Sequence, residues 1–335
     1  MNQGQYQGAR WVRADFHLHS PGAHSFRFPA GISQQDHDEL VRRYVAQLQA
    51  QDIEIAAITD YQQIRAEWFV PIRDAAKEMG ICVYPGVELA FGGGTAGKHG
   101  VHALAIFPYD TDPNEINRAI DKLLDDDSTE PLVSADGAHR DLKPKTSLQE
   151  CLSRLRREQG CLFIFAHPND SNGLFKTYSP GEAADVLNAV LPEAIECFNE
   201  DDRRRLQSTG KITPELLQKI AGVEDSDNHS IEEIGAKARD GRPRCTYLKL
   251  SALNDLRAIR LALRDNALLV RVGNPPQLNY TRFLRLTVEG SGFLGGLDLT
   301  FSPELNVLVG GRGVGKSAIL ETLRFVLDLE SFSPT

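Results

Sequence analysis

The sequence predicts an α/β fold with a parallel sheet. In a chain of this length, such a sheet could close into a barrel. Short apolar or β-branched runs alternate with helical stretches over most of the 335 residues. Ionisable residues lie in these runs or just after them. In a barrel of parallel strands the carboxyl ends of the strands form one ring, so residues that are distant in sequence meet there. We therefore expect one functional site at that ring.

The individual elements follow from local pattern. Apolar runs predict strands at residues 53–60, 81–89, 100–107, 161–168, 193–200 and 221–229. Helices are predicted at residues 68–80, 113–127 and 147–160. The acidic segment 125–145 is expected to form an exposed loop.

A change in composition after residue 270 divides the chain into two units. Residues 1–270 are expected to form the barrel. Residues 271–282 contain a proline pair that blocks regular structure, which predicts a linker. In residues 283–335 we expect strands with glycine-marked turns over 283–311 and an amphipathic helix over 316–330.

Composition limits the classes of function. The formal net charge is −9, so no global positive field attracts nucleic acid, and a polyanion would be held locally by metals or by the cationic stretch 201–211. The five scattered cysteines include no CxxC pair, which predicts reduced thiols. The chain also has no apolar signal core and no run of about 18 apolar residues. We expect a cytoplasmic protein that does not span a membrane.

Histidines and carboxylates of the first 270 residues predict a metal site. In "HLH" and "DNH" the two outer residues are two positions apart, a spacing that on a strand directs both side chains to one face. Imidazole with carboxylate suits zinc, manganese or iron. A shared carboxylate such as Glu88 could bridge two metals, which clamp a phosphate and activate water. The candidate ligands are His17, His19, His24, Asp60, Glu88, His102, His167, Asp227 and His229.

Each of these residues also has an ordinary structural interpretation. A histidine within a strand, such as His102, is often a hydrogen-bonded core residue. His24 and His229 could be surface residues. Asp15 could orient a ligating histidine or cap the end of a strand. The order of the residues along the predicted elements favours the metal site.

The motifs "DFHLHS", "ITD", "GVEL", "HALAI", "FAHP", "IECFN" and "DSDNH" occur in the order seen in PHP-domain (polymerase and histidinol phosphatase) phosphoesterases, which residues 10–265 resemble. The resemblance implies a distorted (β/α)7 barrel with two or three metals. It places one metal on His17, His19, Glu88 and Asp227, which are also the expected catalytic residues. A second metal would lie on Glu88, His102 and His167. A third site would involve His24, Asp60 and His229. That site is expected to be altered, because the chain has Tyr61 where the family usually has histidine after the "TD" pair.

The second unit contains a phosphate-loop motif. "GGRGVGKS" at residues 310–317 fits G-x-x-x-x-G-K-[ST], after the apolar run "LNVLVG" and before a predicted helix. The glycines Gly310, Gly313 and Gly315 would let backbone N–H groups surround the phosphates. Lys316 would reach the β- and γ-phosphates of ATP, and Ser317 would bind its magnesium.

This stretch resembles the first lobe of ABC-type ATPases of the SMC and RecF kind, and its combination with a PHP domain resembles TrlF-like PHP–ATPase fusions. Only eighteen residues follow Ser317, too few for a Walker B strand or a second lobe. We therefore expect a truncated ATPase lobe that binds Mg-ATP but does not hydrolyse it well. Dimerisation would occur through the missing lobes.

The sequence leaves three functional hypotheses. The leading one is a metal-dependent phosphoesterase, a nuclease acting on DNA or RNA, which an SMC-like ATPase regulates in the full-length protein. The second is a phosphatase acting on small phosphomonoesters. The third is a non-catalytic metal- or nucleotide-binding module, which Tyr61 favours and the other candidate ligands oppose.

Overall fold

A computed structural model describes residues 8–92, 100–123, 141–142, 146–236, 244–276 and 280–329. The chain forms two compact units. The larger unit spans Arg10–Pro275, and the second comprises Met1–Ala9 and Pro276–Thr335. Most of the segment 125–145, including its expected loop, lies outside the described residues.

The larger unit is built on a nine-stranded mixed sheet in the order β7-β6-β5-β4-β3-β2-β1-β8-β9. Its two edge strands, β7 and β9, approach one another, so the sheet is nearly closed into a barrel. The strands are β1 (Arg10–Leu18), β2 (Ile53–Ile58), β3 (Cys82–Phe91), β4 (Val101–Ile106), β5 (Leu162–Phe165), β6 (Ala194–Glu196), β7 (Ala221–Val223), β8 (Thr246–Leu250) and β9 (Val270–Val272).

The expectation of an all-parallel sheet is only partly correct. β1, β2 and β3 pair in parallel, as do β5, β6 and β7. β4 is antiparallel to both of its neighbours, and β8 is antiparallel to β1 and β9. Nine residues separate the end of β3 from the start of β4. A parallel crossover needs about a dozen or more, so this connection favours an antiparallel pair.

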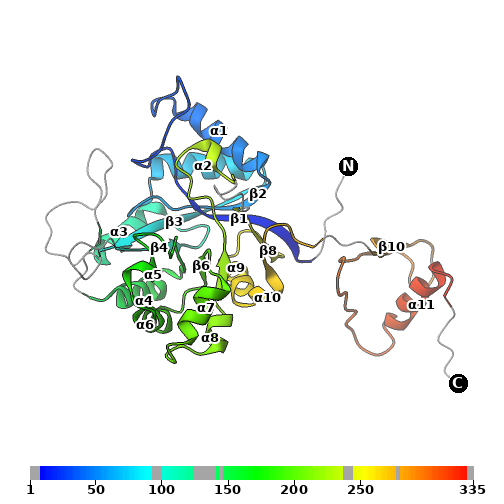
Figure 1. The fold of residues 1–335 in the computed structure, drawn as a ribbon. Helices are drawn as coiled ribbons and strands as arrows, with labels where there is room; N and C mark the ends of the chain where they lie inside the picture. The colour runs from blue at the N-terminus through cyan, green and yellow to red at the C-terminus, as the bar shows by residue number, and fades with distance from the viewer. Residues whose placement is uncertain are drawn as a thin grey trace. The chain divides into compact units, whose positions relative to one another are not determined.

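In Figure 1, α1 and α2 lie above the strands and α4, α6, α7 and α8 lie below them. The buried apolar residues of all six helices belong to one cluster, so these helices cover the same outer face of the curved sheet. Local sequence fixes several of their ends. Ser147 accepts from the Glu150 N–H at the start of α4, and Gly160 ends this helix with a left-handed φ of 68°. The helices are α1 (His37–Ala50), α2 (Ala66–Glu78), α3 (Pro113–Leu123), α4 (Leu148–Gln159), α5 (Leu174–Thr177), α6 (Pro180–Val190), α7 (Glu200–Gln207), α8 (Pro214–Gln218), α9 (Leu256–Arg264) and α10 (Asn266–Leu269), with a 3₁₀ turn at Ile231–Glu233.

Two buried apolar clusters stabilise this unit. The outer cluster lies between the sheet and helices such as α1, α2, α4 and α6. The inner cluster contains inward residues of the strands together with Leu256, Ile259 and Leu263 of α9. Alternate residues of the strands enter different clusters, since side chains alternate across a strand. The barrel interior is therefore a packed core that supports the polar residues at the strand ends.

The second unit contains an antiparallel pair, β10 (Arg285–Val288) and β11 (Leu297–Thr300), and the helix α11 (Lys316–Val326). The run at residues 305–310, expected to be a strand before the phosphate loop, is not one in the structure. Its side chains Leu305, Val307 and Val309 are 85%, 68% and 88% exposed. No described strand pairs with this run. Without a partner strand, the N–H and C=O groups of the run cannot form the hydrogen bonds that a sheet provides. The last residue expected in α11, residue 330, is outside the described range.

Within the described part of the chain, no helix has both the length and the apolar character needed to cross a membrane.

Candidate metal centre

The candidate ligands converge at one end of the barrel, as the strand-end argument predicts. His17 lies in β1 and His19 directly follows it, whereas Asp60 and Tyr61 follow β2. Glu88 is in β3. His102 is at the start of β4, and it reaches the same end because the antiparallel register pairs it with Ala90 of β3. His167 follows β5, Glu196 ends β6, and Asp227 and His229 follow β7.

Glu88 lies at the middle of the site. Its Oε2 atom is 3.1 Å from His17 Nε2 and 3.4 Å from His19 Nε2. Its Oε1 atom is 2.5 Å from His102 Nδ1 and 3.2 Å from His167 Nε2. The two oxygens of one fully buried carboxylate thus each face a pair of imidazoles.

The same contacts define two groups of potential metal ligands. His17, His19 and Glu88 offer ligand atoms that all lie within 4.8 Å of one another. The same holds for Glu88, His102 and His167. Because Glu88 belongs to both groups, the arrangement can hold two cations that share one carboxylate.

Asp227 extends the first group and connects it to His229. Its Oδ1 atom is 3.4 Å from His19 Nε2 and 3.6 Å from His17 Nε2. It is also 3.9 Å from His229 Nδ1, and His19, Asp227 and His229 form a third potential ligand group. The two-residue spacing of "DNH" therefore brings both of its outer side chains to the site.

The third group differs from the one that the family resemblance implies. The Asp60 carboxylate accepts from the Ser20 N–H at 2.8 Å and from the Ser20 hydroxyl at 2.6 Å, and its Oδ1 lies 3.8 Å from His19 Nδ1. His24 is exposed and belongs to none of the three ligand groups found among the described residues. The Tyr61 ring stacks on His19, with ring centroids 4.6 Å apart.

Glu196 is a supporting residue that the candidate ligand set omitted. Its Oε1 atom lies 2.8 Å from His17 Nδ1, and its Oε2 atom accepts from the His167 N–H at 2.7 Å. A hydrogen bond from Nδ1 to Glu196 leaves His17 Nε2 directed at Glu88. Such carboxylate–histidine pairs fix the ring orientation and the tautomer of metal-binding histidines. The only sequence signal for Glu196 was its position at the end of a predicted strand.

Two amides also support the histidines and were not predicted. Asn228 accepts from the His19 N–H at 2.8 Å and donates to the His19 carbonyl at 3.1 Å. The Asn172 amide nitrogen lies 3.2 Å from both ring nitrogens of His102. These contacts join loops after β5 and β7 to the residues that carry the candidate ligands.

Asp15 caps backbone groups and does not contact a histidine ring. It accepts from the N–H groups of His17 at 3.3 Å and Ser226 at 3.1 Å, and from the Ser226 hydroxyl. Burial raises the pKa of Asp15 to about 6, against the opposing effect of the Ser226 hydrogen bonds. Of the two expected roles, the structure therefore has the capping one.

The backbone is left-handed at three successive strand ends. The φ angles of His167, Cys197 and Asp227, which follow β5, β6 and β7, are 26°, 51° and 47°. Non-glycine residues rarely adopt this region, and such strain tends to gather at functional sites. In this protein the left-handed conformation turns the backbone just after each of these strands.

In the centre, the charges of the imidazoles and of the carboxylates shift one another's pKa values. Burial lowers the pKa of His17, but the nearby charges of Glu196, Asp227 and Glu88 outweigh burial and raise it well above its ordinary value. For His19, burial is likewise opposed by Asp227, Asp60 and Glu88, and the pKa rises to about 9. Burial tends to raise the pKa values of Glu88 and Asp227, but the neighbouring histidines dominate and lower both. Without a metal these shifts favour protonated His17 and His19 beside ionised Glu88 and Asp227.

Several buried atoms of the centre make no hydrogen bond. They are both ring nitrogens of His19, which is fully buried, together with His167 Nδ1 and Asp227 Oδ1. A buried polar atom without a partner is costly, and native structures nearly always provide one. A divalent cation fits these atoms, and the imidazole and carboxylate donors suit zinc, manganese or iron.

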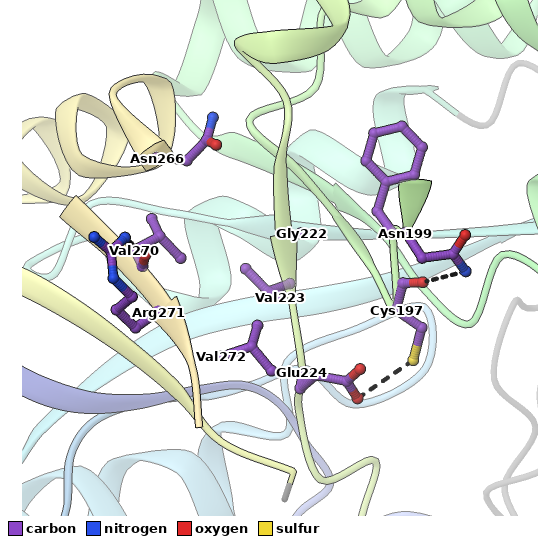
Figure 2. A pocket seen from close by; sticks show the side chains of 10 residues that line it. Cys197, Asn199, Gly222, Val223, Glu224, Asn266, Val270, Arg271 and Val272 are labelled. Carbon is purple, nitrogen blue, oxygen red and sulfur yellow. Dashed lines mark hydrogen bonds between the residues drawn. The ribbon is translucent and has the colours of Figure 1, made fainter. Parts of the chain in front are cut away.

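One cavity adjoins the centre, and a second cavity adjoins the first. The mouth cavity, of about 310 Å³, is lined by His167, Glu196, Asp227 and Arg244 among others. The seam cavity, of about 350 Å³, lies between β7 and β9 and is lined by residues that include Val223, Val270 and Arg271 (Figure 2). Cys197, Asn199 and Glu224 line both cavities, so the two are adjacent.

In the cationic stretch 201–211, Arg203 is held by the protein, whereas Arg204 and Arg205 are exposed on α7. The Arg203 guanidinium lies 4.2 Å from the Phe198 ring centroid and donates to the carbonyls of Leu217 and Ile220. Arg204 pairs with Asp201, and Lys211 pairs with Asp185 at 2.5 Å. These contacts leave less of the stretch for phosphates than the sequence suggested.

In the second unit, residues 310–317 form a turn that leads into α11. Gly313 and Gly315 have left-handed φ values of 83° and 91°, and α11 begins at Lys316. The Lys316 ammonium donates to the carbonyls of Gly310 at 2.7 Å and Gly311 at 2.6 Å. Ser317 lies in the first turn of the helix.

No known family profile matches this chain, and no curated protein matches it. Several solved structures show a distant likeness, among them the following three. PsfC from Pseudomonas syringae is 16% identical, with a TM-score of 0.39 over 76% of this chain and 88% of the other. A protein of Bifidobacterium adolescentis described as a metal-dependent phosphoesterase is 15% identical, with a TM-score of 0.42 over 75% and 95%. An amidohydrolase of Chromobacterium violaceum is 18% identical, with a TM-score of 0.39 over 67% and 90%. With TM-scores below 0.5, these likenesses carry no argument about substrate or mechanism.

Proposed function

We propose that the larger unit is a metal-dependent phosphoesterase that hydrolyses phosphodiester bonds of nucleic acids. One observation carries this proposal: the two oxygens of buried Glu88 face two separate pairs of imidazoles. A carboxylate shared between two ligand groups can hold two divalent cations close together, as in two-metal hydrolytic sites.

The residues divide between two cation positions. His17, His19 and Asp227 would hold one cation and His102 and His167 the other, with Glu88 shared. When bound, the metals would supply a water of lowered pKa and neutralise charge on the phosphate.

The other residues of the centre orient the ligands and receive the substrate. Glu196 would hold the ring of His17 through Nδ1, so that Nε2 remains directed at the cation. Arg244 lines the mouth cavity beside Asp227 and donates to the Ser226 carbonyl, so its guanidinium is held in place. It would bind a non-bridging oxygen of a substrate phosphate as the phosphate approaches the centre.

The test measures hydrolysis of end-labelled single- and double-stranded DNA and RNA with Mn²⁺. Bis-p-nitrophenyl phosphate and p-nitrophenyl phosphate are measured in parallel as a small diester and a small monoester. We expect cleavage of a polymer and of the diester, abolished in a His19→Ala, Asp227→Ala variant. His37→Ala is the matched control, because His37 hydrogen-bonds to the Glu67 carbonyl away from the centre. Turnover of the monoester alone would favour a small-molecule phosphatase, and no turnover would favour a non-catalytic metal-binding module.

For the second unit we propose binding of Mg-ATP at residues 310–317. The support is the glycine-rich turn at the start of α11 with Lys316 directed into it. Titration of a fluorescent ATP analogue with Mg²⁺ tests this, and Lys316→Ala should weaken binding about tenfold or more by removing the cation nearest the phosphates. Equal affinity of the variant and the unaltered chain would contradict it.

A further inference from the structure

The outer side of β1, β8 and β9 has a regular pattern of aromatic and cationic side chains. Strand register pairs Trp11 with Lys249, Arg13 with Tyr247, and Tyr247 with Arg271. Residues paired across antiparallel strands share a face, and so do residues two apart on one strand. All five side chains therefore lie on one face, which we call the β1–β8–β9 face. The residues between them, such as Val12, Leu248 and Val270, are buried in the inner core.

Ring contacts hold the cations of this face in position. The Lys249 ammonium lies 5.8 Å and the Arg271 guanidinium 5.5 Å from the centre of the Trp11 ring. All five side chains of the face are partly exposed. Arg271 donates through Nη1 to the carbonyls of Ala267 and Val270, so its Nε and Nη2 groups are the donors that could meet a phosphate.

The face is locally positive in a chain that is negative as a whole. Arg10, which pairs with Glu54, borders the face, and the charges of Asp52 and Glu54 act on Tyr247. The three cations of the face, Arg13, Lys249 and Arg271, against these two carboxylates give a local charge of +1, whereas the whole chain carries −9. The Arg13 guanidinium also donates to the carbonyls of Gln51 and Gly235.

Shared lining residues connect the face to the metal centre. Arg271 belongs to the face and also lines the seam cavity, as Figure 2 shows. The seam cavity shares Cys197, Asn199 and Glu224 with the mouth cavity, which His167 and Asp227 line. A chain-like ligand on the face would thus have a continuous path of lining residues to the candidate ligands.

We propose that the β1–β8–β9 face binds single-stranded nucleic acid and directs it along the seam cavity to the metal centre. This proposal rests on the phosphodiesterase function proposed above. Proteins that bind single strands without sequence preference combine cations, which contact phosphates, with aromatic rings, on which unpaired bases stack. The indole of Trp11 and the phenol of Tyr247 offer such rings between the cations. A duplex hides its base faces, so it would use only the charges.

The experiment measures the affinity of the full chain for a fluorescent oligothymidylate of about twenty nucleotides by anisotropy, at several salt concentrations. EDTA prevents cleavage of the probe. Lys249→Glu, Arg271→Glu should weaken binding about tenfold or more and reduce the slope of log affinity against log salt by about 1.4, because two phosphate contacts are lost. Trp11→Ala should weaken binding roughly tenfold with little change in slope, and Trp11→Phe should restore it, since stacking is uncharged.

Matched controls separate this surface from charge in general. Arg204→Glu, Arg205→Glu on α7 makes the same change of charge and should bind the probe nearly as the unaltered chain does. Circular dichroism and thermal unfolding establish that each variant is folded. The proposal is overturned if the face variants bind like the unaltered chain, if the α7 variant is weakened as much, or if duplex DNA binds better than the single strand. Hydrolysis of bis-p-nitrophenyl phosphate by the unaltered chain tests the metal centre separately, so its failure is distinguishable from failure at this face.

Discussion

At the scale of single residues, the geometry of the centre depends on which groups the two carboxylate oxygens of Glu88 and of Glu196 contact. Glu88 places one oxygen toward each pair of imidazoles, while Glu196 holds His17 and the backbone N–H of His167. Sequence reasoning named Glu88 and the histidines, because residue type and strand position are enough to suggest a ligand. It omitted Glu196 from the ligand set, because that role depends on which nitrogen of His17 points away from the centre, and only coordinates give this.

The first prediction concerns Glu196. Glu196→Gln keeps the shape of the side chain but removes the charge that orients His17, so Mn²⁺ affinity should fall about 10- to 100-fold. Isothermal titration calorimetry measures this directly. Glu200→Gln is the matched control, because the Glu200 side chain is 82% exposed on α7. Equal affinity of the Glu196 variant and the unaltered chain would show that Glu196 does not support the centre.

The second prediction concerns pH. In the metal-free chain the pKa of His19 is raised from 6.5 to about 9, so its proton is bound more tightly in the folded state than in the unfolded state. The resulting stabilisation is complete below pH 6.5 and is lost as pH rises through 9, by about 3 kcal/mol. Urea unfolding in EDTA between pH 6.5 and 9.5 should show this decline, and His19→Gln should reduce it.

Metal affinity should depend on pH in the opposite direction. A cation must displace the protons that His17 and His19 carry, so Mn²⁺ should bind more tightly as pH rises toward 9. Calorimetry at pH 7 and pH 8 should show an increase of up to about tenfold for each proton released. An affinity that does not change with pH would contradict the protonated state inferred for these imidazoles.

At the scale of elements, the sequence predicted most strands but not their directions. The runs 81–89 and 100–107 became β3 and β4, yet β4 runs antiparallel to both neighbours. An apolar run indicates that a strand is buried but not in which direction the strand runs. For β3 and β4, the sequence signal for an antiparallel pair is the short connection between them. The run at 305–310 shows the converse, because an apolar pattern forms a strand only where a partner strand is present.

The third prediction concerns α9, which contributes Ile259 to the inner core. Ile259 is fully buried, so Ile259→Ala should lower the free energy of unfolding by about 2–5 kcal/mol, through lost burial and a residual cavity. Leu261→Ala on the same helix should change it by less than about 0.5 kcal/mol, because Leu261 is 57% exposed. Urea denaturation compares the two, and similar losses would contradict the packing described here.

At the scale of the whole molecule, residues 10–275 form one unit, which contains every candidate metal ligand, and the phosphate-loop motif lies in the other. The proline pair Pro275 and Pro276 lies where these two units meet along the chain. The convergence of the ligands was predictable, since a closed sheet brings strand ends together. The contents of the third ligand group were not, because the contacts of Asp60 with Ser20 and the exposure of His24 depend on loop conformation.

The left-handed residues His167, Cys197 and Asp227 have a consequence for how the protein acquires its metals. Their geometry belongs to the backbone and to the apolar core beneath it, so we expect the ligands to be arranged by folding and not by the cation. A zinc finger, by contrast, unfolds when a chelator removes its metal. This protein should tolerate being emptied and reloaded, so that metals could be exchanged for one another on the same folded sample.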